Sequence, residues 1–446
     1  MSKQDRHTVR SPFKFLDAYT REDRDLFFGR EEEVEELYQF VQKNRIVLVY
    51  GPSGAGKTSL VQCGLANRFE ATDWVPFYIS RGSDLNESLL AEVGSSRALG
   101  GAPLSDEGLL DALERISTRY VRPVYLIFDQ FEELLILGKE EEIDRFLRLV
   151  AAILQSPQTA SCVLLFIMRE EYFARLDRFE RQIPHFAERR LRVEPMRRAR
   201  LEEVILQSCA HFRITLEEGS ANAGQIIDNL KAGVSLPYVQ VYLDLLWRED
   251  YQRTYPQGWS GDGYPPLEFT TAEIDLLGEI DDVLDRFLTE QEGILQAELE
   301  KRYPGAPPEA VKKVLGAFVS KEGTKRSIGF ERQGEVVTLD DWAQPYLPPL
   351  PAPEALGWLL VALENSRLLR AQGGHFELAH DSLAHLIDAN RSEHERRLNE
   401  LYNRLQTAQR AFADTGEYYS ERQLAIYDEY RPELEPGLPA ELSAFV

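Results

Sequence analysis

The chain has 446 residues, of which 43% are hydrophobic and 28% are charged, and its formal net charge is −23 at pH 7. This length exceeds one compact core, so we expect about two or three domains, and the composition is that of an ordinary soluble globular protein. The negative charge argues against sequence-independent binding to nucleic acid, because an excess of carboxylates cannot replace the counterions of a phosphate backbone.

The cysteines and the N-terminus indicate the cellular compartment of the protein. Cys63, Cys162 and Cys209 lie far apart and form no C-x-x-C pair, so we expect small buried hydrophobes in a reducing compartment. The N-terminus is polar, and the longest apolar runs are far too short to span a bilayer. The sequence therefore predicts a cytoplasmic protein with no membrane contact.

Residues 1–44 form an aromatic-rich lead-in that ends in a helix. Val34, Leu37 and Val41 recur at helical spacing there. Phe28, Gly29 and Arg30 lie directly before this helix and shortly before a loop that, as argued next, binds a nucleotide. We expect these three residues on the adenine side, with Phe27 and Phe28 as an apolar lid, although core packing is the commoner fate of such side chains.

The pattern that dominates the sequence follows the lead-in. Ile46–Tyr50 is a β-branched and aromatic run typical of a strand buried on both faces, and the loop after it matches G-x-x-x-x-G-K-[ST]. The loop residues are Gly51, Pro52, Ser53, Gly54, Ala55, Gly56, Lys57, Thr58 and Ser59. The glycines let backbone N–H groups approach phosphate oxygens, and the helix predicted over Lys57–Phe69 points its positive end at the same charge. Lys57 would reach the β- and γ-phosphates and Thr58 would bind Mg²⁺, so the pattern predicts a P-loop rather than a glycine-rich corner of another kind.

Asp129 is the second candidate ligand of Mg²⁺. The pattern predicts a strand at Trp74–Ile79, helices at Asp84–Val93 and Asp106–Tyr120, and a further strand at Val124–Phe128 that ends in Asp129. A carboxylate at the carboxyl end of a parallel strand lies where the ligands of open α/β sheets bind, and there it can hold the water shell of Mg²⁺. The histidines form no ligand spacing, so we expect no metal beyond one carried by the nucleotide.

Two glutamates follow Asp129 and are candidates for positioning the attacking water. Glu132 or Glu133 could polarise that water, as phosphoryl transfer requires. Acidic residues also favour the first turn of a helix, so a purely structural role is an equal alternative.

Arg169 ends the next predicted strand, Cys162–Met168, which follows a helix at Glu141–Gln155. At the carboxyl edge of the sheet it could reach a γ-phosphate and sense its presence. The alternative is an ion pair with Glu132 or with the two glutamates that come directly after it. The alternation of strands and helices predicts a doubly wound parallel sheet with helices on both faces, closed by Leu191–Val193.

A run of arginines lies next to this closing strand. It comprises Arg189, Arg190, Arg192, Arg197, Arg198 and Arg200. It could form a basic patch for nucleic acid, line the nucleotide or lie in a subunit interface, and the sequence leaves these readings open.

The last part of the chain is predicted to be helical and then mixed. Arg198–Tyr251 has helical periodicity interrupted at Gly233–Pro237, and the Pro- and Gly-rich PQGWSGDGYPP then marks a linker. Small helices and short β-like pieces follow and favour a winged-helix fold. They are the helices Ile274–Leu288, Pro308–Ser320 and Glu354–Asn365 and the strands Ser327–Arg332, Val336–Leu339, Leu368–Arg370 and Phe376–Leu378. Asp388–Phe412 is predicted to be a charged amphipathic helix.

The predicted architecture is thus an α/β fold, a P-loop NTPase doubly wound parallel sheet followed by a helical domain and a winged-helix domain. We expect a lead-in with an adenine-side helix at 1–44, the P-loop core at 45–196, the helical domain at 197–256, the winged-helix domain at 257–390 and a C-terminal helical linker at 391–446.

These segments resemble the signal-transducing ATPases with numerous domains, the STAND class, and within it the novel STAND NTPases of prokaryotes. The similar pieces are SPFKFLDAYTREDRDLFFGREEE, GPSGAGKTS, VYLIFDQFEELL, FIMREEYFARL, AGVSLPYVQVYLDLLW and FELAHDSLA. The resemblance implies a nucleotide switch in which ADP holds the nucleotide domain against the winged helix and ATP releases both to form homo-oligomers. It implies that Pro237 packs near adenine and that His380 touches the ADP β-phosphate. Gln130 departs from the pattern, because many relatives of the wider class carry an acidic residue there.

The resemblance therefore implies a slow regulatory ATPase that uses ATP, ADP and Mg²⁺ and acts in bacterial defence or conflict signalling. The effector and sensor modules usual in the family are expected on separate partners or in a truncated part. An origin-recognition-like or DNA-remodelling AAA-type ATPase shares the same core, but the acidity of the chain counts against it. A nucleotide-stabilised scaffold without turnover is the third possibility.

Overall fold

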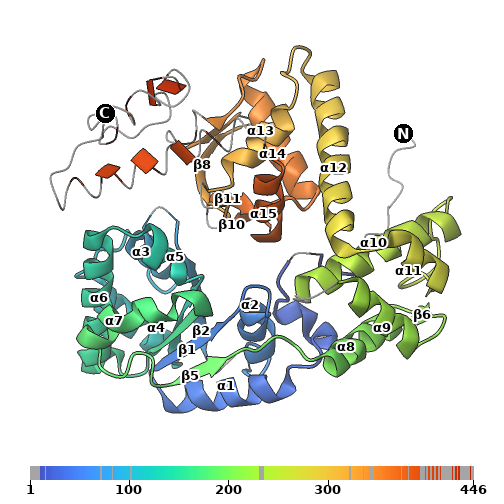
Figure 1. Ribbon diagram of the computed structural model, residues 1–446. Coiled ribbons are helices and arrows are strands. Elements are labelled where there is room, and N and C mark those ends of the chain that lie inside the picture. The colour runs from blue at the N-terminus through green and yellow to red at the C-terminus, as the bar shows by residue number, and fades with distance from the viewer. Residues whose placement is uncertain are drawn as a thin grey trace. The chain divides into compact units, whose positions relative to one another are not determined.

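The computed structural model divides the chain into two units, unit 1 (Met1–Leu284) and unit 2 (Asp285–Val446), which are considered separately (Figure 1). It describes residues 11–391, except 16, 71–72, 83, 101–102, 231–235, 321–322, 335, 341–342, 344–345, 373 and 380, together with scattered residues after 391.

Unit 1 is built on a five-stranded sheet in the order β2-β3-β4-β1-β5. The strands are β1 (Ile46–Gly51), β2 (Val75–Ser80), β3 (Val124–Asp129), β4 (Val163–Arg169) and β5 (Arg190–Arg192). Every neighbouring pair is parallel. The parallel α/β sheet predicted from the sequence is therefore confirmed, with each strand found within one residue of its predicted bounds.

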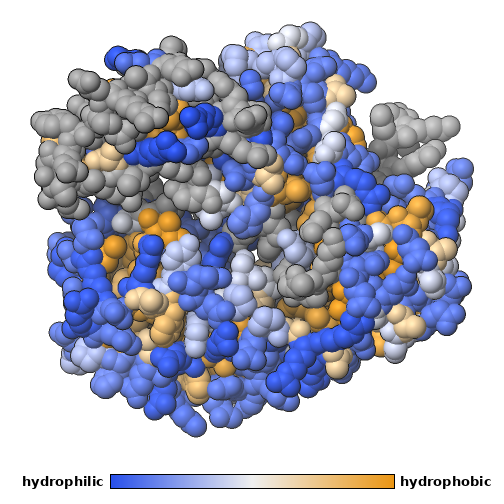
Figure 2. Space-filling model, in the orientation of Figure 1, coloured by the Kyte–Doolittle hydropathy of each residue, from blue (hydrophilic) through white to orange (hydrophobic). Residues whose placement is uncertain are grey.

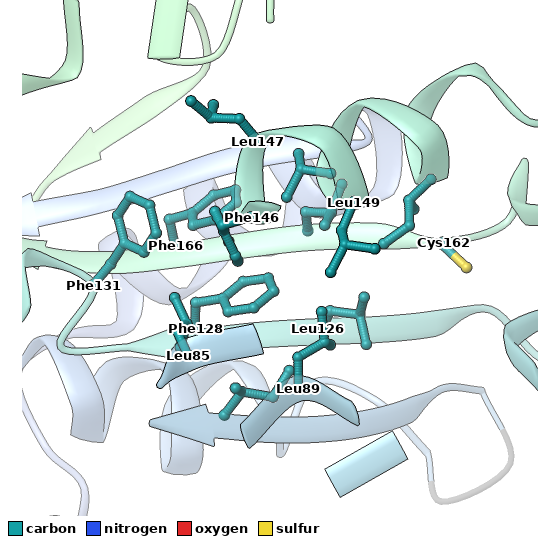
Figure 3. Close-up of a cluster of buried hydrophobic side chains, with 14 of the residues drawn as sticks. Leu85, Leu89, Leu126, Phe128, Phe131, Phe146, Leu147, Leu149, Cys162 and Phe166 are labelled. Atoms are coloured by element: carbon teal, nitrogen blue, oxygen red, sulfur yellow. The ribbon is translucent and has the colours of Figure 1, made fainter. Parts of the chain in front are cut away.

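Side chains alternate between two hydrophobic cores on the two faces of this sheet. In β3, Leu126 and Phe128 face one core, whereas Tyr125 and Ile127 face the other. The first core is drawn in Figure 3, where Phe128 stacks on Phe166 with ring centroids 5.0 Å apart. Because β3 and β4 are buried on both faces, these two strands read as continuous apolar runs.

Helices cover both faces. The first core includes residues of α3 (Leu85–Gly94), α4 (Leu109–Tyr120), α5 (Glu132–Leu137), α6 (Glu140–Gln155) and α7 (Asp177–Gln182). The second includes residues of α1 (Glu31–Lys43) and of the π-helical turn η2 (Leu60–Leu65). Shorter elements are α2 (Lys57–Ser59) and the 3₁₀ turns η1 (Arg21–Leu26), η3 (Pro157–Thr159) and η4 (Glu170–Leu176).

A helical region completes unit 1. Its elements are α8 (Arg198–His211), β6 (Ile214–Leu216), α9 (Ser220–Asn229), α10 (Leu236–Thr254), β7 (Leu267–Phe269) and α11 (Thr271–Leu277). β6 and β7 pair in parallel, and the Tyr242 hydroxyl on α10 donates to the carbonyl oxygens of Ile274 (3.2 Å) and Gly278 (2.9 Å). The segment after residue 257 therefore belongs in part to unit 1, so the predicted boundary there differs from the division after Leu284.

One segment predicted as a single helix forms two helices in the structure. The sequence predicted a continuous helix over Ile274–Leu288, but α11 ends before Gly278, whose φ of 76° is not helical. A new helix, α12 (Ile280–Arg302), starts beyond it. Glycine adopts this conformation without a steric penalty, which explains why the chain turns at this position.

Unit 2 contains a four-stranded antiparallel sheet in the order β10-β11-β8-β9. The strands are β8 (Ile328–Gln333), β9 (Val336–Leu339), β10 (Leu369–Gln372) and β11 (His375–Leu378), and the helices are α13 (Ala310–Ala317), α14 (Pro353–Asn365) and α15 (Asp381–Ala389). The predicted short strands are confirmed in position, whereas the winged-helix assignment and the remaining domain boundaries stay predictions.

Most of the surface drawn in Figure 2 over unit 1 is hydrophilic. No helix in the described part of the chain combines the length and the apolar character needed to cross a bilayer. Cys63, Cys162 and Cys209 are free thiols buried in unit 1, as predicted.

Candidate functional site

The loop after β1 has the backbone geometry of a tight cradle. A Cβ atom on Gly51 would lie 2.2 Å from the carbonyl oxygen of Val193, so no side chain fits there. Gly54 and Gly56 adopt left-handed conformations with φ of 73° and 88°, which other residues adopt only with strain. The chain then enters α2 and continues into η2, where Ala66 N donates to the carbonyl oxygen of Val61 (3.1 Å). The predicted strand-loop-helix order is therefore present.

Lys57 lies across this loop. Its Nζ donates to the carbonyl oxygens of Gly51 (2.9 Å) and Pro52 (2.8 Å). Burial lowers the pKa of Lys57, while the nearby carboxylates of Glu132 and Asp129 oppose that shift. Carbonyl dipoles hold the ammonium group at the loop.

Thr58, in α2, and Asp129, the last residue of β3, come together although they are far apart in the sequence. The Thr58 hydroxyl oxygen is 3.1 Å from both carboxylate oxygens of Asp129. Gln130 N donates to Asp129 Oδ1 (2.9 Å), and the left-handed φ of Gln130, 55°, turns the chain sharply after β3. A hydroxyl and a carboxylate in this arrangement are oxygen ligands of the kind that Mg²⁺ prefers.

The residues around this pair fit a metal that brings most of its own ligands. No group of three or more His, Cys, Asp or Glu side chains able to hold a metal ion is found within the described ranges. Mg²⁺ commonly binds through one or two protein oxygens plus waters and substrate phosphates. The pair of Thr58 and Asp129 therefore fits a phosphate-borne Mg²⁺ better than a dedicated protein cage.

Glu132, which is buried, and Arg169, which is half-buried, form an ion pair beside the same edge of the sheet. Arg169 lies opposite Gly51 in the register of β4 and β1. Its Nε is 3.2 Å from Glu132 Oε1, and its backbone N–H donates to Glu132 Oε2 (3.2 Å). Glu132 is only 5% exposed, and this burial raises the pKa of its carboxyl group against the opposing effect of Arg169. Of the interactions considered for Arg169, the structure contains the ion pair with Glu132.

Glu133 lies beside Glu132 in the first turn of α5, and its backbone N–H donates to the carbonyl oxygen of Gln130 (2.9 Å). Both glutamates thus also begin a helix, where carboxylates are favoured by the helix dipole. Their catalytic roles stay predictions.

Arg30 contacts the phosphate loop through its side chain. Its Nη2 donates to the carbonyl oxygens of Ala55 (3.0 Å) and Glu194 (2.7 Å), and its Nη1 pairs with Glu33 (2.5 Å). Gly29 has a left-handed φ of 78° and lies against Val204 and Met196. Phe28 is half-buried before it, and its place beside adenine stays a prediction.

The start of α10 touches the phosphate loop, which the sequence did not reveal. Leu236 N donates to the carbonyl oxygen of Gly54 (3.2 Å), and Leu236 Cδ1 lies 3.1 Å from the position of a Cβ on Gly56. Pro237 follows in the first turn of α10 and is half-buried. The contact places its helix next to the loop, while His380 lies outside the described residues.

Ser59 contacts the lead-in. Its Oγ accepts a hydrogen bond from Tyr19 N (3.1 Å), and Lys14 N in the same segment donates to Gln240 Oε1 on α10 (3.3 Å). The lead-in therefore joins the helix after the loop to the helical region. No local sequence signal predicts these contacts, because they depend on the tertiary fold.

Three arginines of the cluster pair with carboxylates. Arg192 pairs with Glu170 (2.8 Å), and Arg198 pairs with Asp228 (2.5 Å). Arg200 pairs with Glu203 (3.0 Å). These ion pairs weaken the reading of the cluster as a basic patch for nucleic acid.

Comparison with known proteins gives a family-level match. A family model described as novel STAND NTPase 1 matches residues 12–419. An uncharacterized ATP-binding protein of Methanocaldococcus jannaschii is 34% identical over 55 residues, 12% of this chain and 15% of that protein. A second one from the same organism is 35% identical over 68 residues, 15% of this chain and 17% of that protein. The chain thus spans less than a fifth of these relatives.

Two solved structures are similar at low identity. The Walker-type ATPase of Pyrococcus abyssi is 15% identical with a TM-score of 0.44, covering 83% of this chain and 98% of that one. The ORC1 protein of Aeropyrum pernix, solved in complex with DNA, is 14% identical with a TM-score of 0.42, covering 82% of this chain and 94% of that one.

Proposed function

Because the chain belongs to the novel STAND NTPase 1 family, we propose that it is a signalling switch that binds ATP and ADP and hydrolyses ATP slowly. The observation that carries this proposal is the meeting of Thr58 and Asp129, 3.1 Å apart, at the end of a glycine-rich loop that holds Lys57. The ATP-binding relatives of Methanocaldococcus jannaschii support the choice of nucleotide.

Each residue of this site has a role in the proposed reaction. The loop N–H groups and Lys57 bind the phosphates, and Lys57 exchanges its carbonyl partners for phosphate oxygens. Thr58 and Asp129 would hold Mg²⁺, which neutralises charge that develops on the phosphates. Arg169, at the end of β4, would leave its ion pair with Glu132 and bind the γ-phosphate instead.

The pair of Glu132 and Arg169 supports slow rather than fast turnover. A carboxylate that accepts from both the backbone and the side chain of Arg169 is not positioned to polarise water until that pair opens. The same observation favours a second candidate function, a nucleotide-stabilised scaffold that does not hydrolyse ATP. The two candidates differ in whether ATP is turned over at all.

The switching role extends this proposal. ADP would hold the nucleotide domain closed against a winged-helix domain through His380, and ATP would release both to form homo-oligomers that act on separate partners in bacterial defence signalling. The hydrogen bond between Leu236 and Gly54 supports a link from the phosphate loop to the helical region.

The proposal is tested by titrating the purified protein with ATP and ADP in a calorimeter and by following phosphate release. Lys57→Ala should weaken both nucleotides by about a hundredfold or more, because charge-assisted hydrogen bonds to the phosphates are lost. Lys43→Ala, at an exposed lysine in the last turn of α1, is the matched control and should bind normally. Equal affinity in Lys57→Ala and in the unmutated protein would remove the P-loop assignment. Binding without phosphate release would favour the scaffold.

Light scattering in ADP and in ATP tests the switch separately. We expect a larger assembly with ATP than with ADP. An identical mass in both nucleotides would refute ATP-driven oligomerisation without affecting nucleotide binding.

A further inference from the structure

Arg30 is a buried arginine at a position that does not favour one. It is the N-cap residue of α1 and makes no side-chain capping hydrogen bond. A cation next to a helix N-terminus is disfavoured by the helix dipole, and Ser, Thr, Asp or Asn is the usual N-cap. The residue is nevertheless only 5% exposed. The stability of α1 therefore does not explain why an arginine is buried at this position.

Its burial carries a further cost. Among the described residues, Arg30 Nε is buried with no hydrogen-bond partner. Glu33, the carboxylate that pairs with the guanidinium, is itself 29% exposed. Apolar replacements of buried ion pairs are often neutral or stabilising. We therefore look for the role of Arg30 in the two carbonyl oxygens that its Nη2 binds.

That nitrogen joins the phosphate loop to the edge of the sheet. Nη2 donates both to the carbonyl oxygen of Ala55, within the loop, and to that of Glu194, directly after Val193. Val193 N donates in turn to Tyr50 O (2.7 Å) on β1. The arginine thus fixes the loop against the sheet that carries it.

The direction of one loop N–H follows from this bond. In a trans peptide the carbonyl and the next N–H point in opposite directions, and the chain has no cis peptide among its described residues. The carbonyl of Ala55 points at Arg30, so the N–H of Gly56 points away from it. In a P-loop this N–H belongs to the group that binds phosphate.

We propose that Arg30 is a positioning residue for the phosphates of the nucleotide, which it never touches, and that it acts by orienting the peptide between Ala55 and Gly56. This inference rests on the proposed function. It differs from the expectation that Arg30 lies beside adenine, because its effect should follow the phosphates and not the base.

The test compares three probes, ADP, adenosine and inorganic tripolyphosphate, by calorimetry on the full chain. Arg30→Met keeps the aliphatic stem and should weaken ADP and tripolyphosphate by about tenfold or more, the worth of one hydrogen bond to a charged group. Adenosine should bind as it does to the unmutated protein. Equal loss for adenosine, or no loss for ADP and tripolyphosphate, would overturn the proposal.

Arg45→Met is the matched control. Arg45 also donates to backbone carbonyl oxygens, those of Leu154 (2.8 Å) and Ile153 (2.9 Å) among them, but from the opposite end of β1. We expect it to lower the melting temperature measured without nucleotide and to leave all three affinities unchanged. A loss of ADP affinity in Arg45→Met equal to that in Arg30→Met would show a general stability effect and refute the assignment.

Arg30→Lys keeps the test decisive if Arg30→Met does not fold. Its ammonium lacks the planar fork of the guanidinium, so ADP and tripolyphosphate should weaken less than in Arg30→Met, again without change for adenosine. Unchanged ADP affinity in a folded Arg30→Lys protein, where Arg30→Met is unfolded, would overturn the proposal. Failure of the unmutated protein to bind ADP would instead refute the proposed function.

Discussion

Asp129→Asn is the substitution that isolates the metal-dependent step. It keeps the shape of the side chain and removes the charge that faces Thr58 Oγ1 at 3.1 Å from both carboxylate oxygens. Without that charge, Thr58 alone cannot hold a phosphate-borne Mg²⁺ in place. Metal ions stabilise transition-state charge by several kcal/mol, so a loss of about 3–4 kcal/mol corresponds to about a 10²–10³-fold fall in the rate of hydrolysis.

The assay is phosphate release against MgCl₂ concentration, with ADP affinity measured in the presence and absence of Mg²⁺. Asp129→Asn should retain ADP binding without Mg²⁺ and lose the gain that Mg²⁺ gives. Asp106→Asn is the control, because Asp106 is an aspartate of the same unit whose carboxylate pairs with Arg145 (2.7 Å). A normal rate and a normal Mg²⁺ dependence in Asp129→Asn would show that this pair is not the metal site.

Three further predictions concern buried charges and thiols. Glu132→Gln should lower the melting temperature more than Glu133→Gln, because it removes the carboxylate that pairs with Arg169. The rate of phosphate release from each variant identifies the carboxylate that positions water. Normal rates in both variants would exclude both residues from that role. Lys325 and Arg370 lower the pKa of Glu377 to about 2, so its contribution to stability is present above its ordinary pKa of 4.5 and is lost as the pH falls towards 2. Urea unfolding should therefore show a smaller loss of stability between pH 4.5 and 2 in Glu377→Gln than in the unmutated protein, and parallel curves would contradict the assignment. The three cysteine thiols should react slowly with a disulfide reagent in the native protein at pH 8, because burial raises the pKa of each thiol and disfavours the thiolate. Fast labelling before unfolding would refute this prediction. They are Cys63, Cys162 and Cys209.

The centre of the sheet could be predicted from the sequence because β3 and β4 each carry a local signal. A strand buried on both faces is a continuous apolar run, and Val124–Asp129 and Val163–Arg169 are such runs. The loop after β1 was recognised for a similar reason, since its glycines are required locally by the path of the backbone. Ile214–Leu216 and Leu267–Phe269 are too short to show a period, and both were missed. β5 is equally short, and it was predicted as the strand that closes the alternation of strands and helices.

The contacts around the loop could not be predicted, because they join residues distant in the sequence. Arg30 reads as one charged residue at the start of a helix, and only the fold brings it to Ala55 and Glu194. Leu236 reads as an apolar residue before a proline, yet its backbone bonds Gly54. The ion pair of Arg169 with Glu132 was one of the alternatives from the sequence, but the sequence could not choose it over the others because the choice depends on the register of the parallel strands.

Consecutive carbonyl groups of the loop are held from different directions. Leu236 at the start of α10 binds the carbonyl of Gly54, and Arg30 before α1 binds that of Ala55. A peptide that rotates to meet a phosphate must keep or break these bonds, because its carbonyl and the following N–H move together. The bond to Arg30 ties the loop to the sheet, whereas the bond to Leu236 ties it to the helical region. Under the proposed switching role, a change in loop conformation between ADP and ATP would therefore be resisted on the sheet side and passed on to α10.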